Sequence, residues 1–197
     1  MSDKDKSSTP RSLARATDEE LMSRVREGDL AAFERLIERF KVGVFSLCYQ
    51  ILRSREDAEE ASQDTFVKAF RARETYDEER KVSPWLLRIA SNAARDILRK
   101  RQTRTLVNSD ILAVEPDQVS NLNPDGDGVH RLDNEEVHRA LGDLSEQYRT
   151  PIVLKYLHGL TNQEIADTIG VSLSSLKVRL SRARELLHAR LWKRWEE

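Results

Sequence analysis

Residues Thr161–Leu187 read TNQEIADTIGVSLSSLKVRLSRARELL, and this stretch decides the expected fold of the C-terminal part of the chain. Thr161 is followed three residues later by Glu164, a capping box that predicts the start of a short helix. Gly170 ends that helix in a tight turn, and Ser172 caps a second helix expected to run to about Trp192. A short helix, a glycine turn and a second helix together form a helix-turn-helix.

The second helix of this motif has an apolar face and a polar, basic one. Its outward positions lie near the helix start, where such helices contact base edges in the major groove: Ser174, Ser175, Lys177, Val178, Ser181 and Arg182. Lysine and arginine donate to guanine acceptors, and Val178 could lie against a thymine methyl group. Arg179 and Arg184 diverge towards the flanking phosphates. The alternative is an ordinary helical hairpin with solvated charges, which the basic excess and the two caps disfavour.

The composition excludes several classes of protein. Among 197 residues, 34% are charged and 6% aromatic, with few glycines and prolines, which is typical of a soluble helical protein. The net charge is only -1, but basic residues cluster in the last helix and around residues 95–104, so local patches can still bind phosphate. The single cysteine, Cys48, precludes an internal disulfide and is expected to be a buried thiol. With no signal peptide and no membrane-length apolar run, we expect a cytoplasmic protein without direct membrane insertion.

Helical periodicity and punctuation divide the chain into four parts. Residues 1–16 are polar and expected to be disordered. Residues 17–104 contain four expected helices, the last starting with Ser83 as cap and Pro84 and running from Trp85 to about Arg101. Residues 105–131 are acidic and contain proline and glycine, which predicts a flexible linker or, alternatively, an ordered acidic loop. Residues 132–197 hold the helix-turn-helix. The fold class is therefore all-α, with two small helical domains joined by a flexible linker.

Two segments of the first domain carry chemistry. The first is the stretch DAEEASQDTFVKAF, which runs from Asp57 to Phe70. It presents an acidic stripe at helical spacing, consisting of Asp57, Glu60, Gln63 and Asp64; a merely solvated face is the alternative. The segment 83–100 combines Trp85, polar side chains and a basic end beside a loop that holds Tyr76. Aromatic rings beside cations suit single-stranded nucleic acid, although Trp85 as a core residue competes with this interpretation.

Both segments resemble the second conserved domain of bacterial sigma factors of the extracytoplasmic-function group, in the sigma-70 family. The resemblance lies in the Asp57–Phe70 motif and in the run from Trp85 through Asn92 and Asp96 to Arg99. The C-terminal stretches 144–149, 160–166 and 178–184 resemble the fourth domain of the same family. Val82 departs from the family pattern, which commonly has an aromatic residue there.

The resemblance implies a transcription initiation factor that binds core RNA polymerase and directs it to promoter DNA. The acidic stripe would dock on the polymerase clamp helices, and the fourth domain would meet the flap. The melted −10 element would be held by Tyr76, Trp85, Arg88, Asn92, Arg95, Asp96 and Arg99. The −35 element would be read as duplex through the outward residues of the last helix. The resemblance also implies an anti-sigma factor as partner.

Enzyme chemistry has no support in the sequence. The four histidines are scattered, and with one cysteine they offer no metal-ligand spacing. No P-loop or dinucleotide glycine pattern is present. We therefore expect no catalytic residues, no metal, no cofactor and no small-molecule substrate. The competing function is a stand-alone helix-turn-helix regulator that binds palindromic duplex DNA as a dimer.

Overall fold

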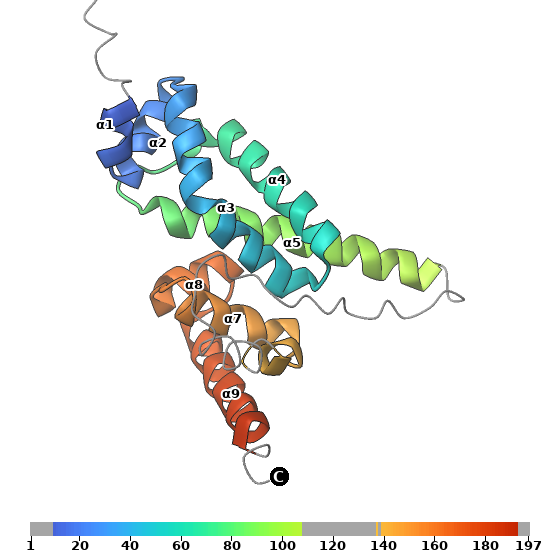
Figure 1. The fold of residues 1–197 in the computed structure, drawn as a ribbon. Helices are drawn as coiled ribbons and strands as arrows, with labels where there is room; N and C mark the ends of the chain where they lie inside the picture. The colour runs from blue at the N-terminus through green and yellow to red at the C-terminus, as the bar shows by residue number, and fades with distance from the viewer. Residues whose placement is uncertain (1–9, 108–136, 138, 193–197) are drawn as a thin grey trace, which may run out of the picture.

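The computed structural model describes residues 10–107, 137 and 139–192, and these residues contain helices but no strand (Figure 1). The N-terminal helical unit, residues 10–107, comprises α1 (Pro10–Arg15), α2 (Asp18–Arg26), α3 (Leu30–Leu52), α4 (Arg55–Arg71), the 3₁₀ turn η2 (Arg73–Thr75) and α5 (Val82–Val107). The C-terminal helical unit, residues 137–192, comprises α7 (Glu146–Tyr156), α8 (Asn162–Ile169) and α9 (Leu173–Trp192). The predicted all-α fold is confirmed.

Side-chain caps start the helices where the sequence places them. Thr17 and Glu20 form a reciprocal capping box at α2, and the Asp29 carboxylate accepts from two backbone N–H groups at the start of α3. Ser54 caps α4 in the same way. Because these caps satisfy N–H groups that a helix leaves free, they fix the breaks between α2, α3 and α4.

The N-terminal unit is built on α3, α4 and α5, which pack against one another. Leu47, Cys48 and Ile51 of α3 meet small residues of the other two helices, including Ala61 and Ala90, and all of them are buried. A second apolar cluster joins α2 to the start of α5. Small residues at these positions let the long helices approach closely, so α5 is held as a rigid support.

Three boundaries differ from the sequence-based expectation. Residues 10–15, expected to be disordered, form α1 and bring Leu13 into the second apolar cluster. Helix α5 begins at Val82 rather than after a Ser83 cap, because Val82 is itself buried, and it continues to Val107, beyond the start of the expected linker. Residues 1–9 and 108–136 lie outside the described part of the chain.

The C-terminal unit contains the predicted helix-turn-helix. Thr161 and Glu164 form the capping box of α8, and Gly170 ends α8 with φ of 70°, a left-handed conformation that favours glycine. Ile165, Leu176 and Ala183 are completely buried between the helices. Residues 137 and 139–142 are helical, and the remainder of the helix predicted for 134–141 lies outside the described residues. The motif is therefore fixed by the cap, the glycine and one apolar seam.

The two units pack directly on each other. Helix α7 lies against α3, and α8 lies against α5 (Figure 1). One buried apolar cluster runs through both units, with Leu87 and Ala94 from one side and Ile152 and Ile169 from the other. The two expected domains thus share a core in this structure, which the sequence did not predict.

Candidate nucleic-acid and polymerase interfaces

The first turns of α9 present the residues predicted to read duplex DNA. Val178 is 69% exposed, which is unusual for a large apolar side chain and leaves it available to a partner. Ser175 and Arg179 are half-buried, and the other predicted contacts are exposed: Ser174, Lys177, Ser181, Arg182 and Arg184. The hydroxyl of Ser172 accepts from the backbone N–H of Ser175, at 3.2 Å, and so fixes the start of the helix. All eight predicted residues therefore lie on one helix.

The charges on α9 have few acidic neighbours. Arg182 donates to Glu185, one turn further on, at 2.9 Å. Arg184 folds back and donates to the backbone carbonyl of Leu180 at 3.3 Å. An exposed pair one turn apart on a helix contributes only about 0.2–0.5 kcal/mol, so it does not prevent Arg182 from turning to a DNA phosphate or base.

Helix α5 carries the residues predicted to hold the melted −10 element. Arg88, Asn92 and Arg99 are exposed along the helix. Asp96 pairs with Arg99 at 3.0 Å and lies 4.0 Å from the ammonium group of Lys68 on α4. These four side chains form a polar surface on which cations and hydrogen-bonding groups alternate.

The predicted aromatic contacts on this surface require a correction. Tyr76 is only 3% exposed, and its hydroxyl donates to the backbone carbonyl of Arg80. Burial, with help from the nearby Glu19, raises the pKa of Tyr76 to about 12. Its ring packs edge-on against Trp85, with centroids 5.1 Å apart. Tyr76 is therefore a core residue here and presents no face on which a base could stack; the sequence could not show this, because the loop brings the ring inward.

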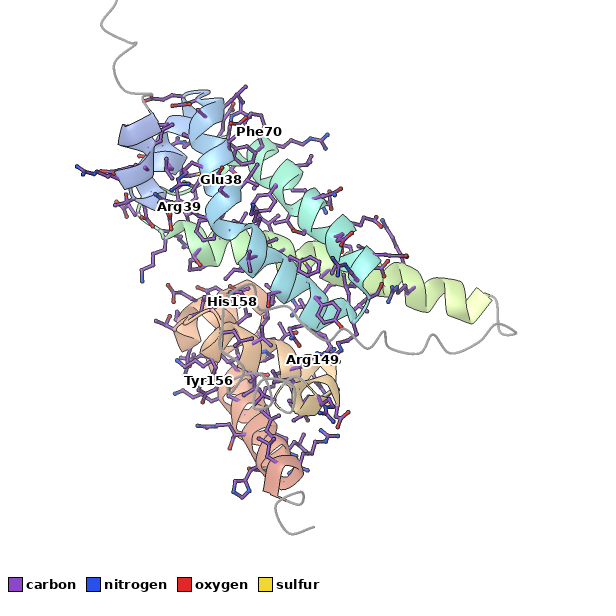
Figure 2. All side chains as sticks on the ribbon, viewed as in Figure 1. Glu38, Arg39, Phe70, Arg149, Tyr156 and His158 are labelled. Atoms are coloured by element: carbon purple, nitrogen blue, oxygen red, sulfur yellow. The ribbon has the colours of Figure 1, made fainter. Side chains whose placement is uncertain are left out.

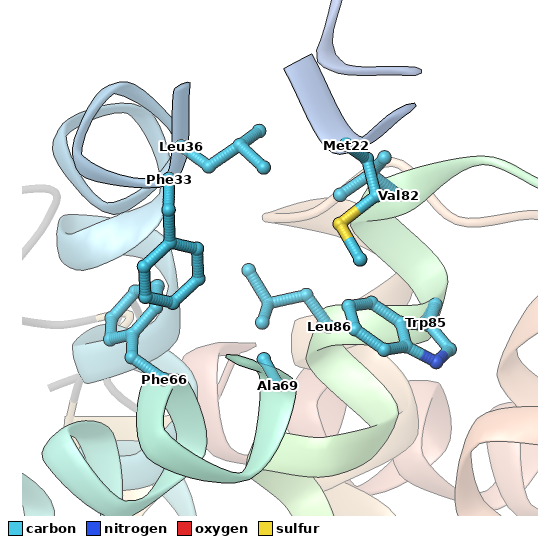
Figure 3. Close-up of a pocket in the computed structure, with 8 residues that line it drawn as sticks. All are labelled: Met22, Phe33, Leu36, Phe66, Ala69, Val82, Trp85 and Leu86. Carbon is cyan, nitrogen blue, oxygen red and sulfur yellow. The ribbon is translucent and has the colours of Figure 1, made fainter. Parts of the chain in front are cut away.

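Trp85 lies at the rim of this core. It lines a small apolar cavity with residues of α2, α3, α4 and α5 (Figure 3): Met22, Phe33, Leu36, Phe66, Ala69, Val82 and Leu86. The lining contains no charged side chain. Trp85 is half-buried, so part of its ring remains available at the surface. Its packing role, the alternative weighed from the sequence, is confirmed by these contacts.

Arg95, a predicted −10 residue, contacts the C-terminal unit, whereas Arg88, Asn92 and Arg99 are exposed. Its guanidinium donates to the carboxylate of Glu146 at 3.2 Å and to the backbone carbonyl of Ile169 at 3.3 Å. Both acceptors belong to the C-terminal unit. The side chain of Arg95 is 20% exposed, so the packing of the two units withdraws it from solvent.

The acidic stripe on α4 is only partly free. Glu60 and Gln63 are exposed, and Asp64 pairs with Lys68, one turn away, at 2.7 Å. Asp57 differs, because its side chain is 21% exposed and pairs with Arg101 of α5. Arg101 also donates to the carbonyl of Leu52, at 3.4 Å. Asp57 thus helps to join α4 to α5, while the other three residues face outward.

Two polar residues at the contact between the units escaped the sequence-based reasoning. Arg149, on α7, is 6% exposed and donates to the carbonyls of Gly142 and Leu144 at 3.0 Å and of Ile51 at 3.4 Å. His158 follows α7 and lies beside Gly43 of α3 (Figure 2). Burial lowers the pKa of the His158 imidazole to about 4. Arginine is usually exposed, so there was no reason in the sequence to place Arg149 in the interior. Only the contact between the two units shows that its guanidinium is buried and bonds to backbone carbonyls.

Metal-ligating side chains are not gathered in the described ranges. No cluster of three histidine, cysteine or acidic side chains could hold a metal ion among these residues. Cys48 is buried, and burial raises the pKa of its thiol to about 12, so it is not a reactive nucleophile. None of the helices in the described part of the chain is long and apolar enough to cross a membrane.

Two conserved regions of one protein family match this chain. Residues 36–104 match sigma-70 region 2, and residues 134–187 match sigma-70 region 4. The ECF RNA polymerase sigma factor SigW of Bacillus subtilis is 31% identical over 86% of this chain and 94% of its own length. The ECF RNA polymerase sigma-E factor of Haemophilus influenzae is 31% identical over 89% of this chain and 95% of its own.

Solved structures show the same architecture. CnrH, determined in complex with the cytosolic domain of CnrY, superposes with a TM-score of 0.64 at 28% identity, over 88% of this chain and 96% of that one. The sigma factor RpoE from Bartonella quintana, determined with the anti-sigma factor NepR, has a TM-score of 0.65 at 23% identity, over 81% of this chain and 96% of that one. The second comparison supports the fold alone.

The helix-turn-helix, the polar face of α5 and the two matched regions define a promoter-directed transcription initiation factor. The chain belongs to the sigma-70 family, in the ECF group of RNA polymerase sigma factors. Members of this family act in transcription initiation and are not a class of enzymes.

Proposed function

We propose that this chain brings core RNA polymerase to its promoters by reading two DNA elements with two different helices. Helix α5 would hold the melted −10 element through Arg88, Asn92, Arg95, Asp96 and Arg99, with Trp85 at the edge of the surface. Helix α9 would enter the major groove of the −35 element. The observation that carries this proposal is the exposed row on α9, from Ser174 to Arg182, fixed by a buried seam on the opposite face.

Polymerase docking is assigned to α4 and to the C-terminal unit. Glu60, Gln63 and Asp64 would meet the clamp helices, beside the 46% exposed Val67, which adds apolar area to an acidic surface. The C-terminal unit would meet the flap. The chemistry of RNA synthesis would belong to polymerase, so we propose no catalytic activity for this chain, and we place its action in the cytoplasm, where polymerase works.

We further propose that an anti-sigma factor controls this chain. The resemblance noted in the sequence supports such a partner. CnrH, at 28% identity, was captured with the cytosolic domain of CnrY, so a relative of this chain binds a protein domain of that kind.

Run-off transcription with purified core polymerase and fragments of the host genome tests the proposed function. We expect specific start sites that disappear when the chain is omitted. A stand-alone regulator would instead bind palindromic duplex tightly as a dimer and give no specific start on any fragment. That second result would overturn the proposal.

Lys177→Ala and Arg182→Ala should each weaken initiation at promoters that depend on −35 contacts. A direct base contact is worth about 1–3 kcal/mol, so the expected loss of initiation is roughly 5- to 150-fold. The measurement is the rate of run-off transcription on promoters with and without the −35 element. Arg190→Ala is the matched control, because Arg190 lies further along α9 and pairs with Asp143 at 3.6 Å. An equal loss on both promoter types would make these residues phosphate ligands rather than base readers.

Asp64→Arg should reduce the affinity for core polymerase by about tenfold or more, because it reverses a charge on the proposed docking surface. The measurement is binding of labelled chain to core polymerase at two salt concentrations. Glu38→Arg is the control, since Glu38 is an exposed acid on α3 that pairs with Arg35 at 2.6 Å. If Asp64→Arg binds core polymerase with unchanged affinity, the acidic stripe is an ordinary solvated face and not a docking surface.

A further inference from the structure

Helices α1 and α2 precede the stretch that matches sigma-70 region 2, which begins at residue 36. They nevertheless contact the segment that leads into α5, because α2 packs against both η2 and α5. Leu13 of α1 and Met22 of α2 are buried in one apolar cluster with Tyr76 and Val82. Val82 is the first residue of α5. The N-terminal helix pair, α1 and α2, therefore supports the start of the proposed −10 surface from inside.

Two polar contacts of α2 hold the loop 77–81, which joins Tyr76 to α5. The backbone N–H of Val82 donates to the Glu19 carboxylate at 3.4 Å. The first N–H groups of a helix have no partner within it, so Glu19 supplies an acceptor where a negative charge is also favourable. Arg26, the last residue of α2, pairs with Glu78 in the loop. Helix α2 thus holds the loop at its middle and at its junction with α5.

The N-terminal helix pair is itself anchored on α3. The guanidinium of Arg39 donates to the Asp18 carboxylate at 2.7 Å and to the carbonyl of Ala14 at 3.3 Å. Asp18 belongs to α2 and Ala14 to α1, so one side chain of α3 holds both helices. Because α3 also packs on α5, the helix pair and the start of α5 share one rigid support.

Tyr76 closes the loop from inside. Its hydroxyl donates to the carbonyl of Arg80. The N–H of Arg80 donates to the carbonyl of Asp77 at 3.0 Å, and the Asp77 carboxylate accepts from the N–H of Glu79 at 3.1 Å, which makes this stretch a tight turn. The Tyr76 ring also meets Trp85 edge-on, with centroids 5.1 Å apart. The conformation of the loop and the orientation of Trp85 therefore depend on the same side chain.

The packing around Trp85 makes its orientation sensitive to this contact. Trp85 lines a small apolar cavity together with Met22 and Leu86 (Figure 3). A ring that borders a cavity lacks part of the neighbouring atoms that would fix its position. An edge-on aromatic pair favours one arrangement by roughly 2- to 12-fold. The contact with Tyr76 thus selects the orientation in which the half-buried indole reaches the surface.

We propose that Tyr76 is a positioning residue for Trp85, and that the N-terminal helix pair holds it in place through Glu19 and Arg26. The exposed part of the indole offers a face on which an unpaired base of the −10 strand stacks. Tyr76 does not touch DNA; it restricts the indole before binding, so that less freedom is lost when the base stacks. The assignment depends on the proposed role of α5 in binding the −10 element. It adds a function for the helices that precede the matched region 2.

A double-mutant cycle in holoenzyme tests whether Tyr76 acts through Trp85. The probe is a promoter fragment found by run-off transcription, and the readout is permanganate reactivity of unpaired thymines. Tyr76→Leu should lower the equilibrium constant for promoter melting by roughly 2- to 12-fold, whereas Tyr76→Phe keeps the ring and should lose less. In a Trp85→Ala chain, Tyr76→Leu should cause no further loss. An equal loss with and without Trp85, or normal melting by Trp85→Ala alone, would overturn the proposal.

Val25→Ala separates positioning from a general loss of stability. Val25 is completely buried in the same cluster as Tyr76 but does not line the cavity beside Trp85. Val25→Ala and Tyr76→Leu should both lower the midpoint of thermal unfolding, and only Tyr76→Leu should reduce promoter melting. If Val25→Ala reduces promoter melting as much, the cluster contributes stability alone and the proposal fails.

The part played by α2 is tested at Glu19. Glu19→Ala removes the acceptor for the first N–H of α5 and should reduce promoter melting. Glu19→Gln keeps an acceptor oxygen and should restore most of it. Glu27→Ala is the control, because Glu27 is an exposed acid at the end of α2. Equal effects of the three substitutions would contradict a role for this hydrogen bond.

Fluorescence of the free full-length chain tests the orientation of Trp85 without polymerase. Trp192→Phe and Trp195→Phe leave Trp85 as the remaining tryptophan of the three. In that chain, Tyr76→Leu should increase quenching by acrylamide and lower the anisotropy, and Tyr76→Phe should change both less. Unchanged values for Tyr76→Leu would overturn the proposal. Absence of specific starts in run-off transcription, by contrast, would overturn the promoter function and leave the fluorescence result unaffected.

Discussion

Leu176→Ala is expected to lower the free energy of unfolding by about 2–5 kcal/mol and to abolish initiation that depends on the −35 element. Leu176 is completely buried at the start of α9, within the apolar cluster that both units share. Truncation removes the transfer free energy of the side chain and leaves a cavity that the neighbouring helices cannot fill. Since this side chain fixes α9 against α8, the exposed reading row would lose its orientation as well.

Urea unfolding followed by circular dichroism measures the stability loss, and run-off transcription measures the functional one. Leu173→Ala is the control, because Leu173 lies in the same first turn of α9 and is 36% exposed. It should change the free energy of unfolding by less than about 1 kcal/mol. A loss at Leu176 no larger than that at Leu173 would contradict the buried seam.

Acidification from pH 7.5 to pH 5 is expected to destabilise the folded chain by about 2 kcal/mol through His158 alone. The pKa of His158 lies at about 4, below the ordinary value of 6.5, because packing removes most of the imidazole from water. The unfolded chain then binds a proton that the folded chain does not. The stabilising contribution is therefore complete above pH 6.5 and is lost progressively as the pH falls from 6.5 towards 4.

Unfolding free energies measured across this pH range test the prediction. His158→Asn should flatten the dependence between pH 6.5 and pH 5, because asparagine does not titrate there. His188→Asn is the matched control, since His188 is exposed on α9, and it should keep the slope of the parent chain. If the free energy of unfolding depends on pH equally in the parent and in His158→Asn, protonation of His158 is not the cause of the destabilisation.

The caps and apolar spacing were sufficient to predict most helices. The capping box at Thr161 starts a helix where expected, because it satisfies backbone N–H groups within a few residues of sequence. The start of α5 was misplaced, although Ser83–Pro84 is a strong local signal. Burial of Val82 against α2 favours an earlier start, and this tertiary contact overrides the local preference.

The candidate site was predictable where one helix carries it. The outward row on α9 follows from helical spacing within a single element, and the structure leaves six of its eight residues exposed, with Ser175 and Arg179 half-buried. The surface on α5 was harder to predict, because the loop before α5 and the C-terminal unit decide which of its residues are exposed. Tyr76 turns inward and Arg95 turns to Glu146, because a loop and a second unit reach them. Spacing along one helix cannot show either contact.

The sequence by itself therefore determined the helical class, the helix-turn-helix and the residues of its reading face. Each of these depends on interactions within about four residues, or on periodicity along one helix. Only the tertiary structure decided that the two units share a core, that Arg149 is interior and that Arg95 is occupied by the C-terminal unit. The physical reason is that these contacts join residues far apart in the chain, whose apolar and charged surfaces meet only when both units have formed.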